Sequence, residues 1–509
     1  MKTENGLSRR GLLQAAGGFT FFALAPGAEA LVGTSHESLA SSADLIPVFT
    51  AIPYLQPGPS SSRLVDGQES MLLAWQTDTT EAKFEVSLGA NGTWSDVSVV
   101  KTPRNLGYKR EGDRRVNFTA NFEGLKLGTR YQYRVKMNGG LLVEGYFTTR
   151  KPRGKKVRFV AFGDNSMGQI SDRAIAYQAY KAAPDFVMNT GDNVYASGLD
   201  NEYARYFFPV YNADLAGPRI GAPLLRSVPF YSVMANHDIN SSDANGPLCD
   251  FDKYVDGLGI YTNLYLPLNG PKPSNPTPIK GKQASVDEFT KAAGERFPKM
   301  ANYSFDCGDI HFTCLDSNRY VDPTDSTLQE WVIQDLKSTD AAWKIVVYHH
   351  PAFNVGNEHY DEQHMRALTP IFEKYGVDLV LSGHEHNYQR TRPMLFAPSD
   401  LKGAKAVGGG ARLVPGAFTV DRDFDGKSNT KPKGIIYLTT GAGGNSLYDR
   451  EMNQAPGSWL HEEDAKADYV HTMISDRHSL TVIDVDRKSL VWKQIDEWGN
   501  EIDRATITK

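Results

Sequence analysis

Apolar residues follow two different rhythms along the chain. Between about residues 46 and 150, apolar and polar positions alternate or nearly alternate over short runs such as 70–76, 83–88 and 129–135, with Gly, Asn and Asp between them. A period of two over short, evenly spaced runs predicts strands of an antiparallel sandwich. We therefore expect an N-terminal all-β sandwich domain over residues 46–150.

After the basic stretch 151–156 the runs become continuously apolar and β-branched, with helix-length segments between them. These runs are 157–162, 186–190, 230–234, 310–315, 345–348 and 377–381. Runs this apolar are typical of strands covered on both faces, so an α/β layered β-sheet domain is predicted over residues 155–460. A capping box at Ser326 and Gln329 predicts that one of its helices begins at Ser326.

Three further segments are distinct from this α/β pattern. Residues 239–300 are Pro-rich in part and residues 396–433 are rich in Gly and charge, so both are interpreted as surface insertions, the first long enough to shape a substrate entrance. Residues 478–485 and 489–494 have the pattern of a pair of strands. They place a C-terminal β extension over residues 465–509, packed on the α/β domain.

The N-terminus has the order of an export signal. Arg9 and Arg10 precede a mildly apolar run without charge, and the small-x-small triplet 28–30 follows it. This order resembles a twin-arginine signal over residues 1–30, and a Ser- and Ala-rich linker over 31–45 follows. The apolar run is shorter than the roughly 20 residues that a bilayer span requires. We expect no stable membrane span and a periplasmic or secreted protein.

Composition and charge narrow the class of partner. Of the 509 residues, 40% are hydrophobic and 23% charged, which is typical of a globular protein with several domains. The net charge of -5 argues against a nucleic-acid partner. The three cysteines, Cys249, Cys307 and Cys314, are too few for a disulfide framework, and the last two are expected on the arms of one hairpin that turns at residues 308–309.

Candidate chemistry gathers where five of the apolar runs end. The segments are Gly163-Asp164, Gly191-Asp192-Asn193-Val194-Tyr195, Ala235-Asn236-His237-Asp238, His349-His350-Pro351 and Ser382-Gly383-His384-Glu385-His386. Ligands bind outside the carboxyl ends of strands in open α/β sheets, so these side chains are expected at one edge of the sheet. Carboxylate, imidazole, amide and phenolate donors suit two metal ions, which a carboxylate such as Asp192 can bridge.

Together these segments resemble the five motifs of purple acid phosphatases within the calcineurin-like metallophosphoesterases. The resemblance covers nearly all of the chain after the signal, and the N-terminal domain resembles a fibronectin type III domain with a buried Trp75 and a tyrosine corner. It implies a dinuclear centre of Fe(3+) with Fe(2+), Zn(2+) or Mn(2+). The implied ligands are Asp164, Tyr195 and His386 for the ferric site, Asn236, His349 and His384 for the divalent site, and Asp192 as the bridge.

The resemblance also implies an acid phosphatase that hydrolyses phosphomonoesters, a small-molecule substrate, by attack of a metal-bridging hydroxide on phosphorus. By family position, His237 and His359 orient phosphate and protonate the leaving alcohol. Glu358 stands where the plant-type enzymes have a second histidine, and its carboxylate would repel a dianionic phosphate. A metal-dependent phosphodiesterase or nucleotide pyrophosphatase therefore stays open, as does a solvated loop position for His359. A metal-stabilised binding protein is the alternative from another class.

Some polar residues near the motifs are given no catalytic role. His350, Tyr388 and Arg390 flank the ligands and are expected to be supporting or structural. Asp316 ends an apolar run as the ligands do, but no partner for it is visible in the sequence.

Overall fold

The computed structural model describes residues 46–509, apart from 60–63, 65–67, 91, 107–113, 241–247, 275, 357, 409 and 449–466. The predicted export signal and linker lie outside the described residues. Within the described ranges, no helix combines the length and the apolar character needed to cross a bilayer.

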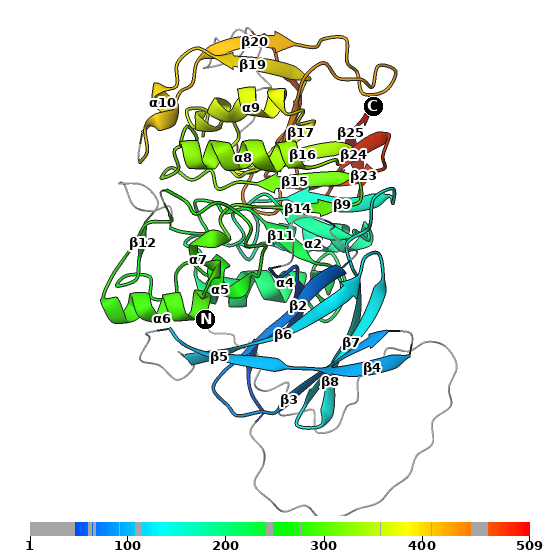
Figure 1. The fold of residues 1–509 in the computed structure, drawn as a ribbon, viewed down its shortest axis with the longest axis vertical. Helices are drawn as coiled ribbons and strands as arrows, with labels where there is room; N and C mark the ends of the chain where they lie inside the picture. Colours follow the sequence, from blue (N-terminus) through cyan, green and yellow to red (C-terminus); the bar gives the residue numbers. More distant parts are fainter. Residues whose placement is uncertain are drawn as a thin grey trace, which may run out of the picture. The chain divides into compact units, whose positions relative to one another are not determined.

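The N-terminal strands form two four-stranded antiparallel sheets, drawn in blue and cyan in Figure 1. Their orders are β1-β2-β6-β5 and β4-β3-β7-β8. The bounds are β1 Phe49–Gln56, β2 Gln68–Thr77, β3 Phe84–Ala90, β4 Thr93–Val97, β5 Val99–Asn105, β6 Arg114–Lys126, β7 Arg130–Met137 and β8 Gly140–Thr148. The predicted all-β sandwich is confirmed.

Alternation of side chains builds the core of this sandwich. Trp75 on β2 is fully buried and its ring stacks on Phe118 of β6. The hydroxyl of Tyr131 accepts a hydrogen bond from the backbone N–H of Lys126 at 2.9 Å, which ties the start of β7 to the end of β6. This bond has the form of a tyrosine corner, while the fibronectin type III name remains a prediction.

The α/β part contains two large sheets, whereas we expected all motifs at the edge of a single sheet. The first has the order β11 (Phe230–Ser232), β10 (Phe186–Asn189), β9 (Val157–Phe162), β23 (Ser479–Val485), β24 (Ser489–Asp496) and β25 (Glu501–Thr508). The second has the order β14 (Tyr303–Cys307), β15 (Ile310–Cys314), β16 (Trp343–Val347), β17 (Leu379–Ser382), β21 (Ile436–Thr440), β18 (Tyr388–Thr391) and β22 (Val470–Ile474). The single-sheet expectation is wrong because hydrophobic periodicity identifies strands but not which strands pair.

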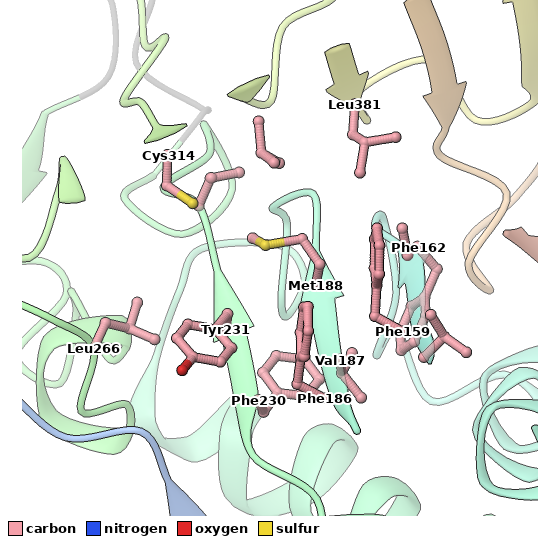
Figure 2. Packing of buried hydrophobic residues seen from close by; sticks show 14 of the residues in the cluster. Phe159, Phe162, Phe186, Val187, Met188, Phe230, Tyr231, Leu266, Cys314 and Leu381 are labelled. Atoms are coloured by element: carbon pink, nitrogen blue, oxygen red, sulfur yellow. The ribbon is translucent and has the colours of Figure 1, made fainter. Parts of the chain in front are cut away.

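The two sheets pack face to face, and alternation along each strand explains why the runs are so apolar. On β16, Ile345 and Val347 lie in the layer between the sheets, whereas Val346 faces the helices. Phe159 of β9 meets Phe312 of β15 edge to face, with ring centroids 5.2 Å apart. Figure 2 shows this inner layer, with Phe159, Phe186 and Tyr231 from the first sheet and Cys314 and Leu381 from the second.

The C-terminal strands are part of the first sheet. β23 pairs antiparallel with β9, and β24 and β25 continue the sheet outward. The predicted strand pair is present, and β25 is a third strand that the pattern did not indicate. The hairpin of β14 and β15 pairs Cys307 with Ile310 as expected, and all three cysteines are buried and unpaired.

Helices cover the outer faces of both sheets. α2 (Ile170–Lys181) contacts β23, and α8 (Ser326–Ser338) contacts both β15 and α9 (Thr369–Lys374). α8 begins at Ser326, as predicted, but its N-cap is Asp325, whose carboxylate accepts the Leu328 N–H at 3.1 Å, and not Ser326. The shorter helices are α3 Asp200–Glu202, α4 Phe208–Tyr211, α5 Ile260–Asn263, α6 Gln283–Ala293, α7 Arg296–Lys299 and α10 Lys402–Lys405.

The two expected insertions contain elements of their own. The first includes β12 (Cys249–Asp250), β13 (Ile279–Lys280) and helices α5 to α7. The second includes the antiparallel pair β19 (Met394–Pro398) and β20 (Gly416–Val420), together with α10. A role for the first insertion at a substrate entrance stays a prediction.

Candidate metal centre

The carboxyl ends of strands from both sheets meet at one place. Five predicted ligands lie within four residues of the ends of these strands, namely Asp164 after β9, Asp192 after β10, Asn236 after β11, His349 after β16 and His384 after β17. Asp164, Asp192 and His384 have left-handed backbone, with φ of 60°, 52° and 69°. Such conformations in residues other than Gly are uncommon and often mark functional sites.

The glycines before these ligands are required by close packing. A Cβ on Gly163 would lie 2.3 Å from Oγ1 of Thr190, and one on Gly383 would lie 2.6 Å from Oδ2 of Asp164. Any larger residue would push the strand ends apart. The Gly residues noted in the sequence therefore allow the two sheets to bring their ligands together.

Tyr195 lies at the centre of the first group of donors. Its hydroxyl is 3.3 Å from Oδ1 of Asp164 and 3.1 Å from Nε2 of His386. The distance between His386 Nε2 and Asp164 Oδ1 is 3.5 Å. The three residues assigned to one metal by resemblance are thus brought together.

His349 lies at the centre of the second group. Its Nε2 atom is 3.0 Å from Oδ1 of Asn236 and 3.1 Å from Nδ1 of His384. Imidazole nitrogens and an amide oxygen are ligand types that divalent metal ions take, so their convergence at this point suits a cation.

Asp192 joins the two groups. Its Oδ2 atom is 2.9 Å from the Tyr195 hydroxyl and 3.5 Å from His349 Nε2, while Oδ1 accepts the backbone N–H of His237 at 2.9 Å. Asp192, His349 and His384 place ligand atoms within 4.8 Å of one another. One carboxylate oxygen therefore faces both groups, which is the placement a bridging ligand needs.

Two of the three histidines are held by a hydrogen bond at their other ring nitrogen, and the third has a carboxylate nearby. His349 Nδ1 lies 2.8 Å from the carbonyl oxygen of Thr190, and His386 Nδ1 lies 2.7 Å from that of Ser446. His384 directs Nε2 toward Glu362 Oε1 at 3.5 Å. A carbonyl or carboxylate that fixes the far nitrogen is the usual support of a metal-binding histidine.

The electrostatics of the site also favour a cation. Burial and the carboxylates of Asp192 and Asp164 raise the pKa of Tyr195 well above its ordinary value. Burial lowers the pKa of His349, but these same carboxylates outweigh it and raise the pKa to about 9. A phenolate at Tyr195 therefore requires positive charge beside it, so the residues present fit a pair of metal ions.

The two candidate catalytic histidines both face this centre. The ring of His237 packs on Tyr195 with centroids 4.4 Å apart, and its Nδ1 atom lies 2.8 Å from the carbonyl oxygen of Ala196. His359 is only partly exposed and its ring lies 3.7 Å from that of His384. The structure thus places His359 against a ligand rather than in a solvated loop.

Three residues near His359 were missed by sequence reasoning. Oε1 of Glu362 lies 3.3 Å from His359 Nδ1, and the hydroxyl of Tyr448 lies 3.4 Å from its Nε2. The Tyr448 ring also stacks on His386 at 4.0 Å, and Glu385 accepts the His359 backbone N–H. Only Glu362 could have been found from the sequence, because a carboxylate three residues after a histidine can reach its ring.

The remaining polar residues have structural contacts. Tyr388 and Arg390 both bind Asp503 of β25, at 2.8 and 2.7 Å, so they connect the two sheets away from the donors. Asp316, which had no visible partner in the sequence, accepts hydrogen bonds from Tyr320 and Asn318.

Comparison with known proteins agrees with this geometry. Residues 157–388 match the family model described as Calcineurin-like phosphoesterase. Purple acid phosphatase 17 of Arabidopsis thaliana is 27% identical over 46% of this chain and 63% of its own length. Purple acid phosphatase 1 of Ipomoea batatas is 24% identical over 78% of this chain and 74% of its own length.

A solved structure agrees at the level of the fold. The purple acid phosphatase PPD1 from yellow lupin (Lupinus luteus) seeds aligns with 90% of this chain and 74% of its own, with a TM-score of 0.61 and 17% sequence identity. The match to the Arabidopsis relative spans less than two thirds of that relative. Residues 157–388 are thus similar to calcineurin-like phosphoesterase domains, and the fold is similar to that of a purple acid phosphatase.

Proposed function

We propose, from the premise that this chain is a purple acid phosphatase-type protein with a calcineurin-like phosphoesterase domain, that it hydrolyses phosphomonoesters at a dinuclear metal centre. The observation that carries the proposal is the pair of donor groups joined by Asp192. Relatives with this domain imply a dinuclear centre, and the two groups provide donors for two ions.

The chain's own residues would divide the work. Asp164, Tyr195 and His386 would hold one ion, and Asn236, His349 and His384 the other. When bound, two cations activate water for attack on phosphorus and neutralise the charge that develops there. His237 and His359 lie beside the donors, where imidazole N–H groups can orient the phosphate and protonate the leaving alcohol.

We also propose the identity of the ions. A phenolate oxygen with a carboxylate and one imidazole forms a hard donor set, which suits Fe(3+). The second group, with an amide oxygen and two imidazoles, suits Fe(2+), Zn(2+) or Mn(2+). Metal analysis together with an absorption spectrum of the purified protein tests this assignment.

The hydrolytic proposal is tested by comparing turnover of 4-nitrophenyl phosphate with that of bis(4-nitrophenyl) phosphate. We expect metal-dependent turnover with the monoester preferred. Asn236→Ala should lower it by about 100-fold or more, since about 3 kcal/mol of transition-state stabilisation is two powers of ten. Asn121→Ala, the same change at an exposed position of β6, is the matched control.

Preference for the diester would favour the phosphodiesterase alternative. Turnover that does not require metal, or is unchanged in Asn236→Ala, would contradict the proposal.

We further propose that the protein is exported folded through the twin-arginine route. The Arg9 and Arg10 pair ahead of an uncharged segment supports this proposal. Changing both to Lys should leave active precursor inside the cell, and normal export of that variant would contradict it.

A further inference from the structure

Glu385 stands between the ligands His384 and His386, yet its side chain is directed away from the metal donors. It is completely buried, with 0% of its surface exposed. Its Oε1 atom accepts the backbone N–H of His359 at 3.1 Å. Burying a carboxylate costs free energy unless hydrogen bonds compensate, so the contact with the His359 backbone is expected to have a function.

The segment that carries His359 closes tightly over this carboxylate. A Cβ on Gly356 would lie 2.3 Å from Oε2 of Glu385 and 2.7 Å from its carboxyl carbon. Glycine is therefore required at 356 by the position of the Glu385 side chain. Both oxygens of Glu385 face residues of the same segment.

Glu385 is itself held rigidly. Its carbonyl oxygen accepts the N–H of Asn387 at 2.6 Å, and a Cβ on Gly441 would lie 2.1 Å from that oxygen. The backbone of Glu385 therefore cannot shift without moving the turn that carries His384 and His386. The Glu385 carboxylate therefore has a fixed position, and its hydrogen bond holds the segment that carries His359.

The other end of the segment has separate supports. Gln389 Oε1 accepts the N–H of Val355 at 3.1 Å, and Asn354 Oδ1 accepts that of Gly356 at 2.7 Å. At the His359 end, the Asn354 amide donates to the His359 carbonyl oxygen at 3.3 Å. Glu385 is the contact in this set that links the backbone of His359 directly to the turn of the metal ligands.

We infer that Glu385 is the positioning residue that fixes His359 at the metal centre. The imidazole that protonates the leaving alcohol then keeps its place relative to His384 and His386. This inference rests on the proposed hydrolytic function. Glu385 would not touch substrate or metal, because its oxygens face residues 356 and 359.

The test uses Glu385→Leu, which removes the acceptor at similar size, and Glu385→Gln, which keeps it. Removing a general acid costs most with poor leaving groups, by about 100-fold. We expect Glu385→Leu to lose about tenfold or more in kcat with glycerol phosphate but less than about threefold with 2,4-dinitrophenyl phosphate. Metal content should be that of the wild type, and Glu385→Gln should be close to the wild type.

A double-variant cycle shows whether Glu385 acts through His359. If it does, Glu385→Leu causes no further loss in a His359→Ala protein, because the positioned group is already gone. Losses that multiply, equal losses with both esters, or an equal defect in Glu385→Gln would overturn the inference.

Gly356→Ala tests the same contact from the segment side, should Glu385→Leu fail to fold. It should show the same dependence on leaving group, since the added Cβ displaces the segment. Amide hydrogen exchange of residues 354–356 and 358–360 should be faster in both variants, and this readout needs no activity. A wild type without metal-dependent hydrolysis would defeat the proposed function, whereas unchanged exchange would defeat the positioning role.

Discussion

At the scale of single residues, the site is built from positions that are conformationally expensive. Asp164, Asp192 and His384 adopt left-handed backbone, which costs roughly 1–2 kcal/mol for each non-glycine residue. The surrounding packing has to offset this cost. That packing is tight, because a Cβ on Gly163 would collide with Thr190 and one on Gly383 with Asp164.

Tyr195 provides the first test at this scale. Tyr195→Phe keeps the ring but removes the oxygen that lies between Asp164 and His386. We expect the oxidised wild type to have a phenolate-to-iron absorption band in the visible, and the variant to lose that band while part of its hydrolysis survives. Absorption spectra and iron content measure this outcome. A colourless, iron-free wild type would contradict the ferric assignment and leave other dinuclear metals possible.

Tyr448 provides the second test. Tyr448→Phe keeps the ring stacked on His386 but removes the hydroxyl beside His359 Nε2. One hydrogen bond is worth about 1 kcal/mol, so kcat/KM should fall by roughly fivefold to tenfold. Tyr146→Phe, an exposed tyrosine on β8, is the control. Unchanged kcat/KM would mean that the Tyr448 hydroxyl does not support His359 during turnover.

At the scale of elements, hydrophobic patterns predicted the strands and the residues at their ends. The turns after β9, β10, β11, β16 and β17 carry the donors that the sequence placed there. The patterns could not assign these strands to two sheets, because pairing depends on contacts between distant segments. For the same reason Glu385 and Tyr448 were missed, since each acts on a loop that is remote in sequence.

His311 connects three elements and provides the third test. Its ring lies 2.7 Å from Asp306 of β14 and 2.9 Å from Asp335 of α8. Burial lowers the pKa of His311, but the two carboxylates outweigh it and raise the pKa to about 9. A raised pKa in the folded state stabilises the protein below the unfolded value of about 6.5, and this contribution is lost as pH rises through 9.

Urea unfolding of wild type and His311→Asn at several pH values measures this effect. The difference in unfolding free energy should shrink between pH of about 6.5 and 9, by on the order of 3 kcal/mol. His471→Asn, at an exposed histidine, serves as the control. A difference that stays constant over this range would show that His311 is not held as a cation.

At the scale of the whole molecule, residues 46–509 form one compact unit although the sequence suggested separate domains. Buried polar contacts connect the sandwich to the α/β part. Arg150 binds Glu69 of β2 at 2.6 Å and also donates to the carbonyl oxygen of Asp306 at 3.1 Å. Composition shifts mark where the chain changes character, but they carry no information about how strongly the parts are joined.

Asp200 provides the last test, at this junction. Its carboxylate is paired with Arg104 of β5, and both side chains are buried. Burial and the nearby Arg115 lower the pKa of Arg104 to about 9, so this arginine is charged at neutral pH with a narrower margin than usual. Asp200→Ala would leave a buried cation without its partner, which typically costs about 3–5 kcal/mol.

We expect Asp200→Ala to lower the unfolding free energy by that amount, measured by urea unfolding. Asp214→Ala, which breaks an exposed pair with Arg226, should change it by less than about 1 kcal/mol. Adding Arg104→Met should recover part of the loss, because the unpaired charge is then removed. If the sandwich were an independent domain, Asp200→Ala would separate two unfolding transitions. A single shifted transition is expected, since the buried pair belongs to one cooperative unit.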